Sequence, residues 1–274
     1  MPKRALKKAY MMRTFPGGGD KLSWMEKFKM LKQAGFDGAE PPSDQDHKEI
    51  LAACDATGLG IAGITVGHHT RTMSDPDPKK RALATEALKN ALRDAKAFNA
   101  TSVLCVAGRV DENIHYADAY KRIHDAVKGA VPLAEELGVR IAIENVWNNL
   151  ILDPIEMARF IDEFNSPFVG SHFDIGNCMS DGWPEQWIPI LGKRISRIHV
   201  KEYSQKKEKS QGVHKGFNVD YLQGDNDWPA IMSALDAIGY GPWATVEPAY
   251  HPPHVAPQDR LNQISQALDK ILAS

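Results

Sequence analysis

Hydrophobic positions follow two alternating patterns along the chain. Short runs of apolar and β-branched residues, each about the length of a strand, are separated by longer segments in which apolar residues recur every three or four positions. The short runs predict strands near residues 9–13, 37–40, 61–66, 102–106, 140–144, 169–174, 195–200 and 243–247. The longer segments predict amphipathic helices that each bury one apolar stripe. This alternation, repeated eight times, predicts an α/β fold in which a parallel sheet closes into a (β/α)8 TIM barrel.

Turn and capping residues agree with these boundaries. Glycine stands where a predicted helix ends and the next strand begins, at Gly35, Gly58, Gly138 and Gly239. Two predicted helices start with a capping aspartate and an early proline, at Asp153-Pro154 and Asp227-Trp228-Pro229. The sequence contains no linker, low-complexity stretch or shift in composition. We therefore expect residues 1–274 to form a single TIM barrel domain.

Composition and charge narrow the class of partner. A hydrophobic content of 43% over 274 residues is enough to build the core of one barrel-sized domain. The formal net charge is −2 and the isoelectric point is near 6.6, so neither nucleic acid nor an anionic membrane is expected as a partner. The sequence leaves the oligomeric state open.

Cysteine usage and the amino-terminal residues bear on location. Cys54, Cys105 and Cys178 are odd in number, widely spaced and close to apolar segments, which favours buried free thiols in a reducing compartment. The first residues are basic, but the run that follows is too short and polar for a signal peptide, and no later run reaches membrane-spanning length. We therefore expect a cytoplasmic protein.

Four side chains able to bind a metal each stand at the carboxyl end of a predicted strand. They are Glu144, Asp174, His199 and Glu247. The carboxyl ends of the strands of a parallel barrel meet at one open mouth, so these side chains should converge. Three carboxylates and one imidazole form a mixed oxygen and nitrogen cage suited to one divalent metal ion, with Mn²⁺, Mg²⁺, Co²⁺ and Zn²⁺ all acceptable.

The longest segment without a predicted element runs from residue 202 to 227. It follows the seventh predicted strand, so it should rise beside the cage as an irregular loop. Its lysines could cover a substrate or simply face water. No glycine-rich phosphate cradle precedes a late helix, so a substrate phosphate would have to be held by Lys206, Lys207, His214 or Lys215.

Several motifs together resemble a known family. They are Ala142-Ile-Glu144-Asn145, His172-Phe-Asp174-Ile-Gly-Asn177, Arg197-Ile-His199-Val-Lys201-Glu202 and the segment Gly239–Glu247. In this order and spacing they resemble the xylose-isomerase-like sugar phosphate isomerase/epimerase superfamily, and within it most of all the ketose 3-epimerases or the hexulose- and pentulose-phosphate epimerases. The resemblance implies a TIM barrel, a small-molecule sugar substrate and the same four metal ligands.

The chemistry of ketose epimerisation fits these residues. A proton must leave the carbon next to a carbonyl, and the enediolate that forms needs its oxygen charge neutralised, as a divalent metal can do. Inversion also needs two acid/base groups on opposite faces. Glu144 and Glu247 come from well-separated strands, and the resemblance implies that they act as metal ligands and as the two catalytic groups.

A second set of residues consists of candidates for contact with the substrate. The set comprises His68, His69, His172, Lys201, Glu40 and Asn145. All but His172 stand at or just beyond a predicted strand end. His172 should share the face of its strand with Asp174, as Lys201 should share the inward face of its strand with His199. Structural roles are also open: packing for His172, an ion pair with Asp174 or Glu202 for Lys201, and an ion pair at the rim for Glu40. Of His68 and His69, one should face the mouth and the other outward.

Other functions use the same barrel. A keto-polyol dehydratase of the inosose type starts with the same proton removal, and the motif around Lys201 resembles its seventh strand. Endonuclease IV, a metal-dependent nuclease, needs further histidines, but Asn177 stands where one is required and the fourth predicted strand leads to Arg109 without one. A sugar-binding barrel without activity would not need to keep all four ligands.

Overall fold

The computed structural model describes residues 6–17, 21–66 and 68–274, except for the side chains of His68 and His69. Its strands are β1 (Lys7–Met11), β2 (Gly38–Glu40), β3 (Gly60–Ile61), β4 (Ile64–Thr65), β5 (Ser102–Cys105), β6 (Arg140–Glu144), β7 (Val169–Asp174), β8 (Ile195–Val200) and β9 (Trp243–Val246). They form one parallel sheet in the order β3-β2-β1-β9-β8-β7-β6-β5-β4. This nearly closed sheet confirms the predicted TIM barrel.

The third predicted strand differs from the expectation of one continuous run over 61–66. It is split into β3, which pairs with β2, and β4, which pairs with β5, with Ala62 and Gly63 between them. A Cβ at residue 63 would lie 2.7 Å from Glu40 Oε1, so the glycine leaves room for this buried carboxylate. The Ala62 carbonyl instead accepts a hydrogen bond from Arg197 Nε at 2.8 Å. One segment thus joins both edges of the sheet.

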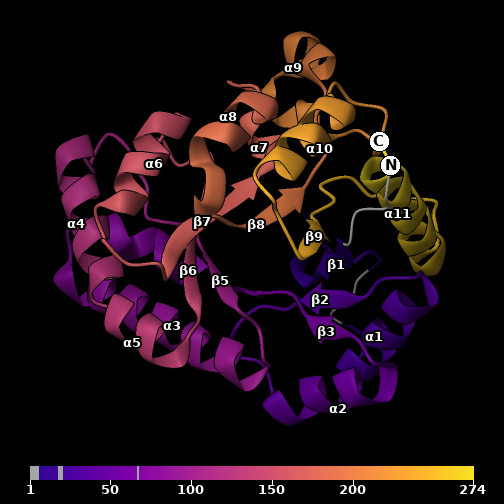
Figure 1. Cartoon of the computed structure of the whole chain (residues 1–274), viewed down its shortest axis with the longest axis horizontal. Helices are drawn as coiled ribbons and strands as arrows, with labels where there is room; N and C mark the ends of the chain where they lie inside the picture. Colours follow the sequence, from indigo (N-terminus) through magenta and orange to yellow (C-terminus); the bar gives the residue numbers. More distant parts are fainter. Residues whose placement is uncertain (1–5, 18–20, 67) are drawn as a thin grey trace.

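Helices surround the strands (Figure 1). The principal ones are α1 (Trp24–Gln33), α2 (His47–Thr57), α3 (Pro78–Ala97), α4 (Tyr116–Lys128), α5 (Val131–Leu137), α6 (Pro154–Asp162), α8 (Pro184–Leu191), α10 (Trp228–Ala237) and α11 (Pro257–Leu272). Shorter pieces are α7 (Ile175–Cys178), α9 (Gln205–Gln211), η1 (Met12–Thr14), η3 (His68–Ser74), η4 (Gly192–Arg194) and η5 (Val213–Phe217). Their apolar stripes and the strands form one large buried cluster. None of the described helices has the length and apolar character that crossing a membrane requires.

The predicted helix boundaries are confirmed where capping chemistry set them. Asp153 accepts hydrogen bonds from the backbone of Ile155 and Glu156 at the start of α6, with Pro154 in the first turn. Gly58 ends α2 in the left-handed conformation, at φ 68°, where glycine carries no steric penalty. The three cysteines are free, as predicted, and Cys105 and Cys178 are buried, whereas Cys54 is only partly buried.

The segment from 202 to 227 is more ordered than the sequence suggested. It contains α9 and η5, where an irregular loop was expected. Ser204 caps α9 by accepting from the backbone of Lys207, and the Tyr203 hydroxyl donates to the Val213 carbonyl at 2.9 Å. The carboxylate of Glu202 accepts from Trp228 Nε1 at 3.0 Å. These buried anchors are single residues within a lysine-rich stretch, so the apolar periodicity that marks other helices is absent here.

Candidate metal centre

Neighbouring strands bring the four predicted ligands together. Glu144 ends β6, Asp174 ends β7, His199 stands one residue before the end of β8, and Glu247 follows β9 directly. Parallel pairing places Asp174 level with His199, so the side chains meet at the carboxyl end of the barrel. One ligand atom from each residue lies within 4.8 Å of the others, and all but the partly exposed Glu247 are buried.

The imidazole of His199 faces the three carboxylates through one nitrogen. Its Nδ1 lies 3.2 Å from Glu247 Oε2, 3.8 Å from Glu144 Oε1 and 3.8 Å from Asp174 Oδ2. Although fully buried, Nδ1 has no hydrogen-bond partner among the described residues. A buried nitrogen aimed at three oxygens without a hydrogen bond is the arrangement expected of a metal ligand.

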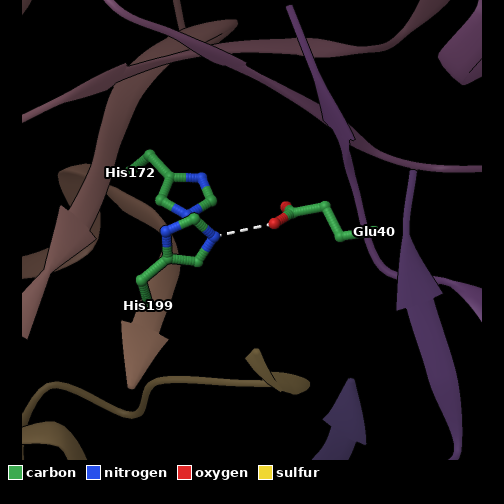
Figure 2. A group of neighbouring side chains, drawn as sticks. All are labelled: Glu40, His172 and His199. Atoms are coloured by element: carbon green, nitrogen blue, oxygen red, sulfur yellow. Dashed lines mark hydrogen bonds and ion pairs between the residues drawn. The ribbon is translucent and has the colours of Figure 1, made fainter. Parts of the chain in front are cut away.

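The other nitrogen of His199 is held by Glu40. His199 Nε2 lies 2.7 Å from Glu40 Oε2, both groups are buried, and Figure 2 shows the carboxylate approaching the ring from β2. When Nε2 carries the proton and donates it to Glu40, Nδ1 presents its lone pair to the cage. The donor set therefore fits one divalent ion, because three carboxylates and one neutral imidazole would supply the ligands.

The electrostatics of the cage are those of a site that attracts a cation. Burial raises the pKa of Glu144 to about 7, and the carboxylates of Glu247 and Asp174 add to this effect. Burial also acts to raise the pKa of Glu247, but the ammonium of Lys201 and the His199 ring outweigh it and hold that pKa well below its usual range. A divalent ion among these groups would favour the ionised form of each carboxyl.

The ammonium of Lys201 contacts two carboxylates of the cage. Its Nζ is 2.6 Å from Glu247 Oε2 and 3.0 Å from Asp174 Oδ2, and it also donates to Asn177 Oδ1 at 3.2 Å. Burial disfavours the charged amine, but the carboxylates around it raise its pKa above the usual value. The sequence left open an ion pair with Asp174, and the structure has one.

Asn145 orients a ligand through its amide. Its Nδ2 donates to the Asp174 carbonyl and its Oδ1 accepts from the Asp174 backbone N–H, both at 2.8 Å. The Asp174 side chain in turn accepts from Asn177 N at 2.7 Å through Oδ1. These bonds fix Asp174 and leave Oδ2 facing Lys201 and His199.

The remaining predicted substrate contacts lie at different depths. His172 is fully buried next to His199, with ring centroids 4.1 Å apart, and neither of its nitrogens has a hydrogen-bond partner among the described residues (Figure 2). Glu40 is equally buried. Both side chains therefore lie in the barrel interior, and the surface of the cavity next to the cage is formed by other residues. The side chains of His68 and His69 lie outside the described part of the chain.

A cavity of about 500 Å³ opens above the cage. Its volume is typical of small-molecule sites. The residues that line it include Glu144, His199, Lys201 and Glu247. Two arginines that the sequence reasoning missed, Arg13 and Arg71, also line it. Arg13 closes the predicted strand 9–13, so the strand-end rule that selected the metal ligands could also have selected it. A second cavity, of about 620 Å³, lies at the opposite ends of β6, β7 and β8 and contains none of the cage residues.

The structure is that of a TIM barrel with a group of side chains that could hold a metal ion, and comparison with known proteins identifies the family. Residues 28–271 match the family model of the xylose isomerase-like TIM barrel, and the chain belongs to this family. A protein of Escherichia coli (strain K12) named "Putative L-ribulose-5-phosphate 3-epimerase SgbU" is 25% identical over 235 residues, which cover 80% of this chain and 81% of that protein.

Solved structures share the fold at lower sequence identity. The 3-keto-D-glucoside 4-epimerase YcjR from E. coli is 15% identical, with a TM-score of 0.81 over 98% of this chain and 100% of that chain. The IOLI protein with a bound zinc atom is 16% identical, with a TM-score of 0.80 over 98% of both chains. Other structures of similar TM-score are named as D-allulose, D-psicose and L-ribulose 3-epimerases.

Proposed function

We propose that this protein is a divalent-metal-dependent sugar epimerase that inverts C3 of a ketose. The observation that carries the proposal is the cage itself. Its three carboxylates and His199 Nδ1, which has no hydrogen-bond partner among the described residues, converge at a cavity of about 500 Å³. The choice of carbon is supported by the E. coli relative and by several structural neighbours, whose names are those of 3-epimerases.

In this proposal Glu144, Asp174, His199 and Glu247 hold the metal. The bound ion would act as a Lewis acid toward the carbonyl and hydroxyl oxygens of the sugar. Asn145 fixes Asp174 through its backbone, and Glu40 holds the His199 ring with Nδ1 toward the cage. Both are positioning residues, because they act through a ligand.

Glu144 and Glu247 are proposed to move the proton. They stand at the ends of β6 and β9, with β7 and β8 between them, so they approach the cavity from two sides of the cage. One carboxylate removes the proton from C3 and the other returns a proton to the opposite face, which inverts the carbon. Lys201, at 2.6 Å, fixes the carboxylate of Glu247.

The proposal is tested with ketoses incubated in D₂O. Protein loaded in turn with Mn²⁺, Mg²⁺, Co²⁺ or Zn²⁺ is given a panel of free and phosphorylated ketoses, and the products are analysed by NMR after the metal is removed. Deuterium should appear at C3 with inverted configuration, while the carbonyl stays at C2. A protein carrying both Glu144→Gln and Glu247→Gln serves as the control and should give no exchange.

Two other outcomes would contradict the proposal. Migration of the carbonyl between C1 and C2 without exchange at C3 would identify an aldose–ketose isomerase. Loss of water would identify a keto-polyol dehydratase, for which Lys201 at the cage would be a candidate acid. Elemental analysis should find one divalent ion per chain, and three ions per chain would instead point to a nuclease-type cluster.

A further inference from the structure

Two arginines, Arg13 and Arg71, line the same cavity as the metal cage. Arg13 lies in η1, directly after β1, and Arg71 lies in η3, after β4. The cage comes from β6 to β9, so the arginines and the cage occupy different parts of the barrel wall. All of these side chains line the same cavity of about 500 Å³. A sugar-sized molecule bound at the cage would therefore share its cavity with the two arginines.

Neither guanidinium has a carboxylate partner among the described residues. Among the described residues Arg13 donates one hydrogen bond, from Nε to Thr65 Oγ1 at 3.2 Å, and its two terminal nitrogens have no partner there. Both side chains are exposed. Arginines elsewhere differ, since Arg194 forms a two-point ion pair with Asp162 and Arg93 pairs with Glu86.

The charge balance of the cavity leaves these two arginines in excess. The three carboxylates of the cage are matched by the ammonium of Lys201 together with one divalent ion. Glu40 lies deeper in the barrel, where it interacts electrostatically with the buried guanidinium of Arg197. With the metal bound, Arg13 and Arg71 are thus the cavity-lining charges that no described residue neutralises.

The lysine-rich segment 202–227 does not supply an alternative anion site in this cavity. None of Lys206, Lys207, His214 and Lys215 lines the cavity as the described residues define it. The Lys207 ammonium donates to the Asn218 carbonyl, and the backbone of Lys206 donates to Asp225. At least one lysine of α9, Lys207, therefore binds the backbone of its own segment.

We propose that Arg13 and Arg71 form a subsite for an anionic group at the end of the substrate remote from the metal. The substrate class is then a ketose that carries a phosphate ester or a carboxylate. Two guanidiniums match the charge of a phosphate monoester, which is near −2 at neutral pH, and planar guanidinium forks suit phosphate and carboxylate oxygens. This inference rests on the proposed epimerase function, because it assumes that the sugar carbonyl lies at the cage.

Kinetics on matched substrates tests the subsite. We would compare D-ribulose with D-ribulose 5-phosphate, and D-tagatose with D-tagaturonate, using the metal-loaded protein and its Arg13→Gln and Arg71→Gln variants. Charge-assisted hydrogen bonds are worth enough that each substitution should raise KM for the preferred anionic ketose about 10- to 100-fold, with a smaller change in kcat. The neutral ketoses should be unaffected. The preferred anion, phosphate or carboxylate, identifies the group.

A control and a binding measurement separate the two proposals. Arg93→Gln removes an exposed arginine of α3 that pairs with Glu86 and should leave every constant unchanged. Calorimetric binding of D-ribulose 5-phosphate and D-tagaturonate does not depend on turnover. If no ketose exchanges at C3, the epimerase proposal fails, while weaker anion binding by the arginine variants would still support the subsite. Equal affinity for charged and neutral ketoses, unchanged by either substitution, would overturn it.

Discussion

Charged side chains are paired differently in two regions of the molecule. One region is the outer helices, and the other is the cage at the carboxyl ends of the strands. On the helices they form separate pairs in contact with water, such as Arg194 with Asp162 and Lys121 with Asp125. In the cage, Glu144, Asp174 and Glu247 crowd around the buried Nδ1 of His199, which has no hydrogen-bond partner among the described residues.

This difference shows which charges serve stability and which serve binding. Buried like charges within a few ångströms of one another destabilise a fold unless something neutralises them. Exposed pairs contribute little in either direction. The cage therefore has the character of a binding site held in place by the packed barrel around it, whereas the outer pairs are ordinary surface interactions.

The largest expected effect concerns the two glutamates of the cage. Glu144→Gln and Glu247→Gln should each lower kcat about 10²- to 10⁴-fold, because each would remove one of the two proposed acid/base groups. Turnover is measured at saturating metal, so that weaker metal binding does not hide the loss. The matched control is Glu86→Gln on α3, which should turn over normally. Near-normal turnover in either cage variant would remove that residue from the mechanism.

A smaller effect is expected beneath the cage, at Glu40. Glu40→Leu removes the acceptor that holds His199 Nε2, and metal affinity should fall about 10- to 100-fold, as for other partners of metal-bound histidines. Glu40→Gln keeps an acceptor oxygen and should lose less. Calorimetric titration with Zn²⁺ measures the affinity, and circular dichroism confirms that the variants are folded. Equal affinity in all three proteins would show that Glu40 does not position the ligand.

The smallest effect is expected on the outer surface. Asp162→Asn breaks the pair with Arg194, but the carboxylate is 56% exposed, so the free energy of unfolding should fall by less than about 1 kcal/mol. The hydrogen bonds from Arg194 lower the pKa of Asp162. The pair's contribution should therefore be present above the unfolded pKa of about 4 and disappear as pH falls through the lower folded value.

Urea unfolding of wild type and Asp162→Asn at pH 7 and at pH 3, each at low and high salt, measures this contribution. Metal affinity should be the same in both proteins. A loss of metal affinity as large as that of the Glu40 variants would mean that the outer pairs and the cage are not as different as their geometry indicates.

Much of the fold and most of the cage followed from local patterns. The strand ends at Glu144, Asp174 and His199 were predicted because apolar runs have a fixed period and parallel strands share one direction. Capping residues such as Asp153 marked helix starts for the same local reason. The helix α9 escaped prediction, because a lysine-rich stretch without an apolar stripe carries no periodic signal.

The sequence by itself determined the alternation of strands and helices, the parallel barrel and the set of four candidate ligands, since each depends on neighbours in the chain. Only the tertiary structure decided that Glu40 binds His199, 159 residues away, that Lys201 contacts the cage, and that the third strand divides at Gly63. It also decided that Arg13 and Arg71 line one cavity. These pairings depend on how the barrel closes and on which side chains share its interior, and no local period encodes either.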